Sequence, residues 1–120
     1  MNNVLDMSVV DELLSISDDG DPELLIDLIQ MFLDDGPAKL KSITEGNDAG
    51  DFDMVERAAH SLKGSSGNLG ARHLQDACDE MQLASRKQEL DAVREITPRI
   101  VTAYADAGAA LEKLMASYTT

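Results

Sequence analysis

The sequence is poor in cysteine and in aromatic residues, and both shortages narrow what the protein can be. Cys78 is the only cysteine among 120 residues, so no intrachain disulfide can form. Cysteine pairing therefore gives no information about the cellular compartment. With two Phe, two Tyr and no Trp, the core must come from Leu, Ile, Val, Met and Ala. Leu, Met and Ala are strong helix formers, so this composition favours a helical domain.

Basic residues are also scarce, at 10 against 23 acidic residues, which gives a formal net charge of −13. No Lys or Arg precedes Lys39, and those that follow are spread along the chain. Nucleic acids and anionic membranes both attract clustered Lys and Arg. We therefore expect no nucleic acid partner and no membrane partner, but a protein partner with some basic surface.

Long apolar runs are missing as well. No stretch approaches the roughly 20 residues that span a bilayer, and the N-terminus lacks the basic start and apolar stretch of a secretory signal. We expect a cytoplasmic protein, and Met1 at its start favours a free-standing one. With 120 residues, 43% of them hydrophobic, the chain has the length for one core, so residues 1–120 are predicted to form a single domain.

The chain does contain apolar residues that recur every three or four positions, which is the period of a helix. The predicted helices cover residues 8–17, 22–45, 52–67, 71–86 and 90–118, with N-caps at Ser8, Asp21 and Asp51, Pro22 opening the second helix, and a loop from Gly46 to Gly50. Pro37 is expected to kink its helix near Leu33, and Pro98 to bend the last helix. No segment alternates long enough to be a strand. The prediction is an all-α fold, an antiparallel four-helix bundle with a short additional N-terminal helix.

Residues 60–67, which read His-Ser-Leu-Lys-Gly-Ser-Ser-Gly, are the most informative segment. The apolar stripe of their helix consists of Phe52, Val55, Ala59, Leu62 and Ser66. At about 100° per residue, His60 lies about 130° from the centre of that stripe and faces solvent. Lys63, Gly64 and Gly67 follow at spacings that place them beside His60, so these residues form one surface patch.

The small residues of this patch suggest a function, because Gly64 in a helix interior costs about 1 kcal/mol relative to Ala. Residues of low helix propensity inside a helix are often found at functional sites. The missing side chains here also let another protein approach the imidazole of His60. A neutral imidazole is a nucleophile, Lys63 offers an ammonium to a phosphoryl group, and Ser65 offers a hydroxyl. No metal-binding carboxylate cluster accompanies the histidine, so the pattern favours a phosphoryl carrier with no metal of its own.

Residues 60–71 resemble the signature of histidine-containing phosphotransfer (HPt) domains of bacterial multistep phosphorelays, and the likeness extends to residues 57–59 and 32–37. Twelve ordered positions with a fixed His–Lys–Gly spacing make this motif specific. The resemblance implies a four-helix bundle and reversible phosphorylation of His60 by exchange with an aspartate of a receiver domain. It also implies that Lys63 and Gly64 aid the phosphoryl group and its access. Gln82 matches the glutamine that holds the non-reacting ring nitrogen.

The resemblance further implies response-regulator receiver domains as partners, including that of a hybrid histidine kinase, with Mg²⁺ on the receiver and a monomeric carrier. One alternative is a non-catalytic docking module, which the intact His60, Lys63 and Gly64 oppose. A histidine kinase is excluded, because the chain has no glycine-rich nucleotide segment and no room for an ATP domain. His73 lacks neighbouring ligands for a metal, and Cys78 on its apolar stripe is predicted to fill the core.

Overall fold

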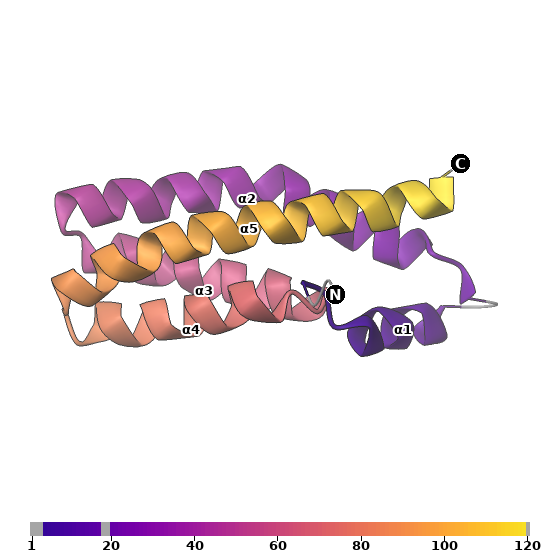
Figure 1. The fold of residues 1–120 in the computed structure, drawn as a ribbon, viewed down its shortest axis with the longest axis horizontal. Helices are drawn as coiled ribbons and strands as arrows, with labels where there is room; N and C mark the ends of the chain where they lie inside the picture. The colour runs from indigo at the N-terminus through magenta and orange to yellow at the C-terminus, as the bar shows by residue number, and fades with distance from the viewer. Residues whose placement is uncertain (1–3, 18–19, 120) are drawn as a thin grey trace.

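The computed structural model describes residues 4–17 and 20–119, apart from the side chain of Thr119. Within these residues the helices are α1 (Met7–Ile16), α2 (Glu23–Ala49), α3 (Phe52–Asn68), α4 (Arg72–Arg86) and α5 (Leu90–Thr119). Helices α2 to α5 form an antiparallel bundle, and α1 lies beyond one end of it (Figure 1). The described residues contain no strand. The prediction of an all-α bundle with a short extra helix is confirmed.

The core of the bundle is aliphatic, as the shortage of aromatic residues predicts. Each bundle helix packs against two neighbours, in the cyclic order α2, α3, α4, α5. The largest fully buried side chains of the bundle are Leu25, Ile29, Ile43, Val55, Leu62, Leu69, Leu74, Met81, Val93, Ile100 and Leu111. Each such side chain stabilises the fold by about 1.5–3 kcal/mol relative to an exposed one. The apolar stripes predicted for the helices therefore do form the core.

The predicted loop from Gly46 to Gly50 is wrong, because α2 continues to Ala49. Gly50, at φ +68°, ends the helix in the left-handed conformation. Gly46 lies buried inside the last turns of α2, where a Cβ would come within 2.6 Å of Cγ2 of Val55 on α3. The close packing of α2 against α3 offsets the low helix propensity of this glycine. From the sequence alone, such a glycine predicts the end of a helix.

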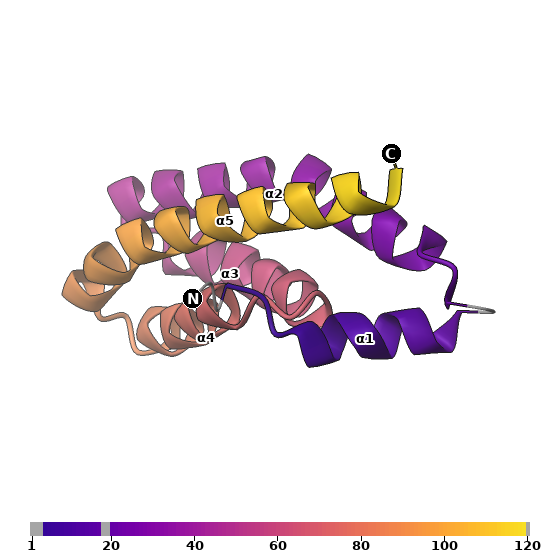
Figure 2. The ribbon, with the colours of Figure 1, turned by 45° about the vertical axis from the view of Figure 1, so that its right-hand side comes forward.

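Helix α1 begins one residue earlier than predicted, because Asp6 and not Ser8 is its N-cap. The Asp6 carboxylate accepts a hydrogen bond from the backbone N–H of Ser8 at 3.0 Å and also bonds the side chain of Arg72 on α4. The backbone N–H of Asp6 donates to the carbonyl of Gly70 at 2.7 Å. These bonds fasten α1 to the link between α3 and α4, and Figure 2 shows it continuing past the ends of both.

The other helix ends coincide with the predicted ones or differ from them by one residue. Asp51 caps α3 as predicted, with its carboxylate accepting from the backbone N–H of Met54 at 3.1 Å. Pro22 is the N-cap residue of α2 and not its first position, and Asp21 accepts from Glu23 at 3.0 Å. The third helix includes Asn68, and the fourth begins at Arg72 and not at position 71. Differences of this size are common at fraying helix ends.

Neither internal proline ends its helix. Pro37 lies inside α2 and Pro98 inside α5, and both helices continue through them, as expected for bends in place of stops. In Figure 1 the first turns of α2 slope toward α1, and the rest of the helix runs alongside α5. The long helices thus provide a continuous scaffold on which α3 and α4 present their outer faces.

Candidate functional site

His60 lies in the middle of α3 on its outward face. Its neighbours Ala59 and Leu62 are buried in the core, whereas His60 itself is exposed. A shallow pocket of about 400 Å³ opens beside the ring, lined by His60, Lys63, Gly64, Gly67, Asn68 and Gln75. The prediction that His60 faces solvent is confirmed, and Lys63, Gly64 and Gly67 share its pocket as their spacing predicts.

Gln82 fixes the orientation of the His60 ring from the neighbouring helix. Gln82, on α4, is 3% exposed, and its amide nitrogen lies 3.1 Å from Nδ1 of His60. Within the described part of the chain, no residue hydrogen-bonds Nε2 of that ring. The predicted contact between Gln82 and His60 is therefore present, and it leaves Nε2 as the ring nitrogen without a hydrogen bond from the described residues.

The direction of this hydrogen bond decides whether Nε2 of His60 is a nucleophile. With the amide nitrogen of Gln82 facing Nδ1, the amide donates and the neutral ring carries its proton on Nε2. A half-turn of the amide places its oxygen there instead, so that Nδ1–H donates and Nε2 keeps its lone pair. Both arrangements have the same shape, and only the second suits attack by Nε2.

The two glycines of the site differ in what surrounds them. A Cβ at Gly64 would meet no other atom within 4 Å, so no packing contact requires glycine there. A Cβ at Gly67 would lie 2.7 Å from the amide nitrogen of Gln75 on α4. Gly64 therefore leaves open space beside His60, as predicted, whereas the space at Gly67 is taken by Gln75.

Lys63 reaches across to α4. Its ammonium donates to Oδ1 of Asp79 at 2.7 Å, and the two side chains are 38% and 54% exposed. Lys63 also lines the pocket of His60, so the cation lies at the site while paired to a carboxylate. Sequence reasoning missed both Asp79 and Gln75. Their spacing from Gln82, three and seven residues, is the signal that places all of them on one face of α4.

Ser65 is the predicted site residue that the structure does not bring to the His60 pocket. Its hydroxyl lies 3.3 Å from the carbonyl oxygens of Ser61 and Leu62, one turn earlier in the same helix. Serine in a helix interior often bonds its own backbone in this way, which occupies the hydroxyl hydrogen. Ser65 lies instead on a groove between α2 and α3, and the neighbouring Ser66 is buried as predicted.

This groove between α2 and α3 adjoins the histidine. It measures about 480 Å³, and apolar and acidic side chains of α2 face the small residues of α3 across it. It is lined by Leu28, Met31, Phe32, Asp34, Asp35, Gly36, Ala38, Lys39, Ser61, Leu62, Ser65, Asn68 and Leu69. Met31 is 58% exposed at its edge. A groove of mixed apolar and polar character therefore includes Ser61, the residue that follows His60.

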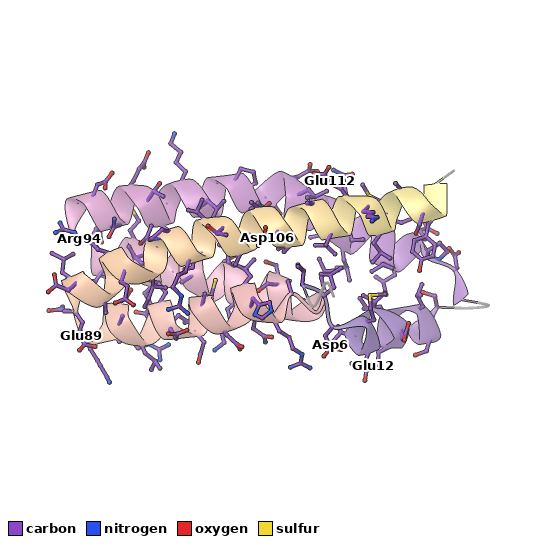
Figure 3. All side chains as sticks on the ribbon, viewed as in Figure 1. Asp6, Glu12, Glu89, Arg94, Asp106 and Glu112 are labelled. Atoms are coloured by element: carbon purple, nitrogen blue, oxygen red, sulfur yellow. The ribbon has the colours of Figure 1, made fainter. Side chains whose placement is uncertain are left out.

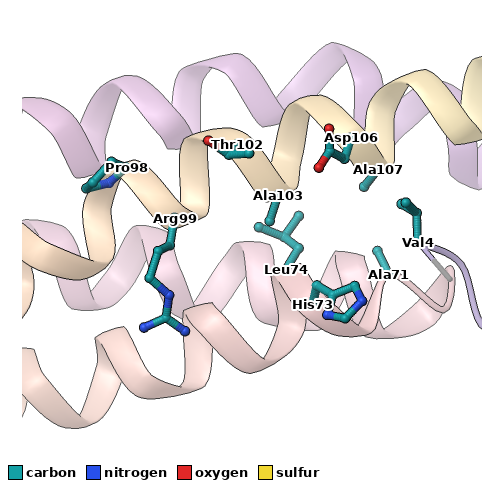
Figure 4. Close-up of a pocket in the computed structure, with 10 residues that line it drawn as sticks. All are labelled: Val4, Ala71, His73, Leu74, Pro98, Arg99, Thr102, Ala103, Asp106 and Ala107. Carbon is teal, nitrogen blue, oxygen red and sulfur yellow. The ribbon is translucent and has the colours of Figure 1, made fainter. Parts of the chain in front are cut away.

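The second histidine belongs to a different surface. His73 lines a pocket of about 400 Å³ between α4 and α5 with Arg99 and Asp106, none of which lines the His60 pocket (Figure 4). Over residues 4–17 and 20–119, no group of three or more His, Cys, Asp or Glu side chains could hold a metal ion. In the same residues, no helix has the length and apolar character needed to cross a membrane.

The remaining titratable groups follow the bundle architecture. Cys78 is fully buried in the core as predicted, and burial raises the pKa of its thiol to about 12. The labelled side chains of Glu12 on α1 and Glu112 on α5 project from the outer faces of their helices, and Glu89 is exposed in the link between α4 and α5 (Figure 3). The surplus of negative charge therefore surrounds the bundle, and Lys63 supplies a positive charge at the His60 pocket.

Comparison with known proteins gives a family and several relatives. A family model described as "Hpt domain" matches residues 27–116. Histidine-containing phosphotransfer protein 5 of Arabidopsis thaliana is 33% identical over 70 residues, covering 56% of this chain and 45% of that protein. Histidine-containing phosphotransfer protein 1 of Oryza sativa subsp. japonica is 24% identical over 112 residues, covering 88% and 76%. The chain therefore spans less than half the length of the first relative and about three quarters of the second.

A solved structure has the same fold. The crystal structure of histidine-containing phosphotransfer protein B from Pseudomonas aeruginosa PAO1 superposes with a TM-score of 0.88 at 24% identity, covering 98% of this chain and 99% of that one. Multistep phosphorelay regulator 1 of Schizosaccharomyces pombe is 25% identical over 93 residues, covering 78% of this chain and 32% of the regulator. The matched family region includes His60, Lys63, Gly64 and Gln82.

Proposed function

The chain belongs to the Hpt domain family, and from that membership we propose that it is a phosphoryl carrier that uses Nε2 of His60. It accepts the group from an aspartate of a response-regulator receiver domain and passes it to another receiver. The observation that carries this proposal is the pairing of an exposed imidazole with a buried amide. Gln82 engages Nδ1 and not Nε2, and His60 lines a pocket that a partner can enter.

The transfer is a displacement at phosphorus. The lone pair of Nε2 attacks the phosphorus of the aspartyl phosphate, the bond from phosphorus to the carboxylate oxygen breaks, and the aspartate leaves as a carboxylate. The ring proton stays on Nδ1, where the oxygen of Gln82 accepts its hydrogen bond and stabilises the charge that develops on the ring. The reverse displacement by a receiver carboxylate returns the neutral imidazole of His60.

Lys63 and Gly64 have separate roles in this proposal. The ammonium of Lys63 lies at the pocket and can interact with the phosphoryl oxygens as their charge is handed over. Gly64 leaves the approach to the ring open, since nothing stands within 4 Å of the place where its Cβ would be. The described residues hold no group of three or more metal-ligating side chains. We propose that the receiver supplies the Mg²⁺. The protein then acts as a carrier and not as an enzyme.

We further propose that receivers, including one belonging to a hybrid histidine kinase, dock over the outer faces of α2 and α3. The groove between these helices offers apolar surface beside His60, and Met31 adds an exposed apolar side chain at its edge. A carrier that must release each partner needs a small and transient contact, below about 1,200 Å². We also propose that the protein is a monomer and is located in the cytoplasm. Size-exclusion chromatography tests the first point, and cell fractionation tests the second.

The test is transfer from a phosphorylated receiver in the presence of Mg²⁺. We expect acid-labile, base-stable label on the wild type and none on His60→Gln. His73→Gln is the matched control, because this histidine lies on another surface and should be dispensable. Label that persists on His60→Gln would show that the site is misassigned. If no receiver of the same organism transfers label to the wild type, the result favours the alternative function, a docking module that is not phosphorylated.

A further inference from the structure

The cation that the phosphoryl group needs is already engaged in the unphosphorylated protein. The ammonium of Lys63 lies 2.7 Å from Oδ1 of Asp79, in an ion pair that joins α3 to α4. Lys63 lines the pocket of His60, whereas Asp79 reaches it only through this lysine. A phosphoryl group that arrives on His60 therefore meets a cation bound to a carboxylate.

Helix α4 presents two different groups to the site from one face. Asp79 precedes Gln82 by three residues, so the carboxylate faces Lys63 and the amide faces His60. The two acidic residues nearest to Asp79 along the helix do not share this arrangement. Glu80 is paired with Arg99 on α5, and Asp76 is exposed and has no hydrogen bond or ion pair to Lys63.

The exposure of the pair makes it weak enough to exchange. Both side chains are partly in water, at 38% and 54% exposure, and ion pairs of this kind contribute little to stability. A phosphoryl group carries about −1.5 to −2 charges near neutral pH, by analogy with other phosphorylated side chains, against −1 for the Asp79 carboxylate. The ammonium of Lys63 therefore moves toward the phosphoryl group when His60 is loaded. Asp79 remains beside it as a competing anion.

We propose that Asp79 is a positioning residue that competes with the phosphoryl group for Lys63 and thereby favours release of that group to receivers. The inference rests on the proposed function and adds a residue to its site. Because Asp79 draws the ammonium of Lys63 away from the phosphoryl oxygens, it raises the free energy of the loaded state relative to the empty one. The protein then holds the phosphoryl group less tightly than it would with Lys63 alone.

The test compares Asp79→Asn with wild type in the complete protein. At equilibrium with a phosphorylated receiver and Mg²⁺, we expect the ratio of loaded to empty carrier to rise by about two- to fivefold. Asp76→Asn is the matched control, because it makes the same charge change on the same helix without contact to Lys63 and should leave the ratio near that of wild type. Asp79→Glu keeps the carboxylate and should retain most of the wild-type behaviour.

A double-mutant cycle separates this competition from a general effect of charge. In a Lys63→Ala background, Asp79→Asn should change the ratio no more than Asp76→Asn does. The inference is overturned if Asp79→Asn and Asp76→Asn act alike, if the effect persists without Lys63, or if label moves toward the receiver. A wild type that takes up no label at all would overturn the proposed function itself, and this inference with it. Circular dichroism of each variant verifies that the helices are intact.

Discussion

The amide of Gln82 lies 3.1 Å from Nδ1 of His60, and it joins a buried residue of α4 to an exposed residue of α3. A buried amide meets little competition from water, so its hydrogen bond holds the ring more firmly than an exposed one would. The reactive atom, Nε2, belongs to α3, but its orientation and protonation are determined from α4. The packing of these two helices is therefore part of the chemistry.

The first prediction tests the direction of that hydrogen bond. Gln82→Ala removes it, and we expect phosphotransfer to slow by roughly fivefold, as the loss of about 1 kcal/mol implies. Gln82→Glu keeps an oxygen opposite Nδ1 of His60 and should transfer at near wild-type rates. Rapid-quench measurement of both variants checks this. Slow transfer by Gln82→Glu would mean that the amide acts as a donor.

The second prediction concerns Gly64, where a Cβ would meet nothing. Gly64→Ala should raise the free energy of unfolding by about 0.5–1 kcal/mol, because alanine favours the helix and no neighbour is displaced. Gly64→Leu should also fold, but it should block transfer by filling the approach to His60. Thermal denaturation and transfer assays on both variants separate these effects. If Gly64→Leu unfolds the protein, the glycine is structural.

The third prediction is the reverse case at Gly46, whose missing side chain is required for packing. A Cβ there would lie 2.6 Å from Cγ2 of Val55, so Gly46→Ala should lower the free energy of unfolding by about 1–3 kcal/mol despite the better helix propensity of alanine. Val55→Ala should restore part of the loss in the double variant by making room. Chemical denaturation measures all three variants. A stabilised Gly46→Ala would contradict the close contact between α2 and α3.

Sequence leads to the histidine more surely than to its surroundings. The position of His60 on the outer face follows from helical period alone, because Val55, Ala59 and Leu62 define the buried side of the same helix. Gln82 came from a family resemblance, and Asp79 was missed. Contacts between helices depend on how far α4 is shifted along α3, and no local pattern in the sequence fixes that shift.

The helix ends show the same difference between local signals, which the sequence reveals, and contacts between helices, which it does not. The cap at Asp51 is a local signal, since its carboxylate bonds an N–H three residues later, and the sequence predicts it correctly. Gly46 and Gly50 look alike in the sequence, yet only Gly50 ends the helix. Gly46 stays helical because Val55 packs against it, and this reason lies 9 residues away in another helix.

A second glycine, Gly36 on α2, also makes room for a side chain of another helix, here Tyr104 on α5. The Tyr104 ring occupies the space that a Cβ of Gly36 would need, it stacks on Phe32 with ring centroids 4.8 Å apart, and its hydroxyl donates to the carbonyl of Phe32 at 2.8 Å. Burial raises the pKa of the Tyr104 phenol. A glycine, a buried phenol and a backbone carbonyl thus join the long helices next to Pro37, where α2 lacks one of its own hydrogen bonds.

The fourth prediction is an alkaline loss of stability that depends on Cys78. Burial raises the pKa of this thiol from 9.0 to about 12, although the nearby charge of Lys63 acts in the opposite direction. Unfolding frees the thiol to ionise near its ordinary pKa. The contribution of Cys78 is therefore complete below pH 9 and declines as the pH rises toward the folded pKa, by about 1.4 kcal/mol per pH unit.

Cys78→Ala removes this titration, and it should flatten the fall in the free energy of unfolding above pH 9, even if it lowers stability at neutral pH by leaving a small cavity. Tyr104→Phe is the matched control, because burial also raises the pKa of the Tyr104 phenol, from an ordinary value of 10.0 that lies above that of the thiol. Denaturation curves measured at intervals from pH 7 to 11 give both slopes. If wild type and Cys78→Ala decline in parallel, ionisation of the thiol does not destabilise the folded core, and the thiol is less buried than the structure indicates.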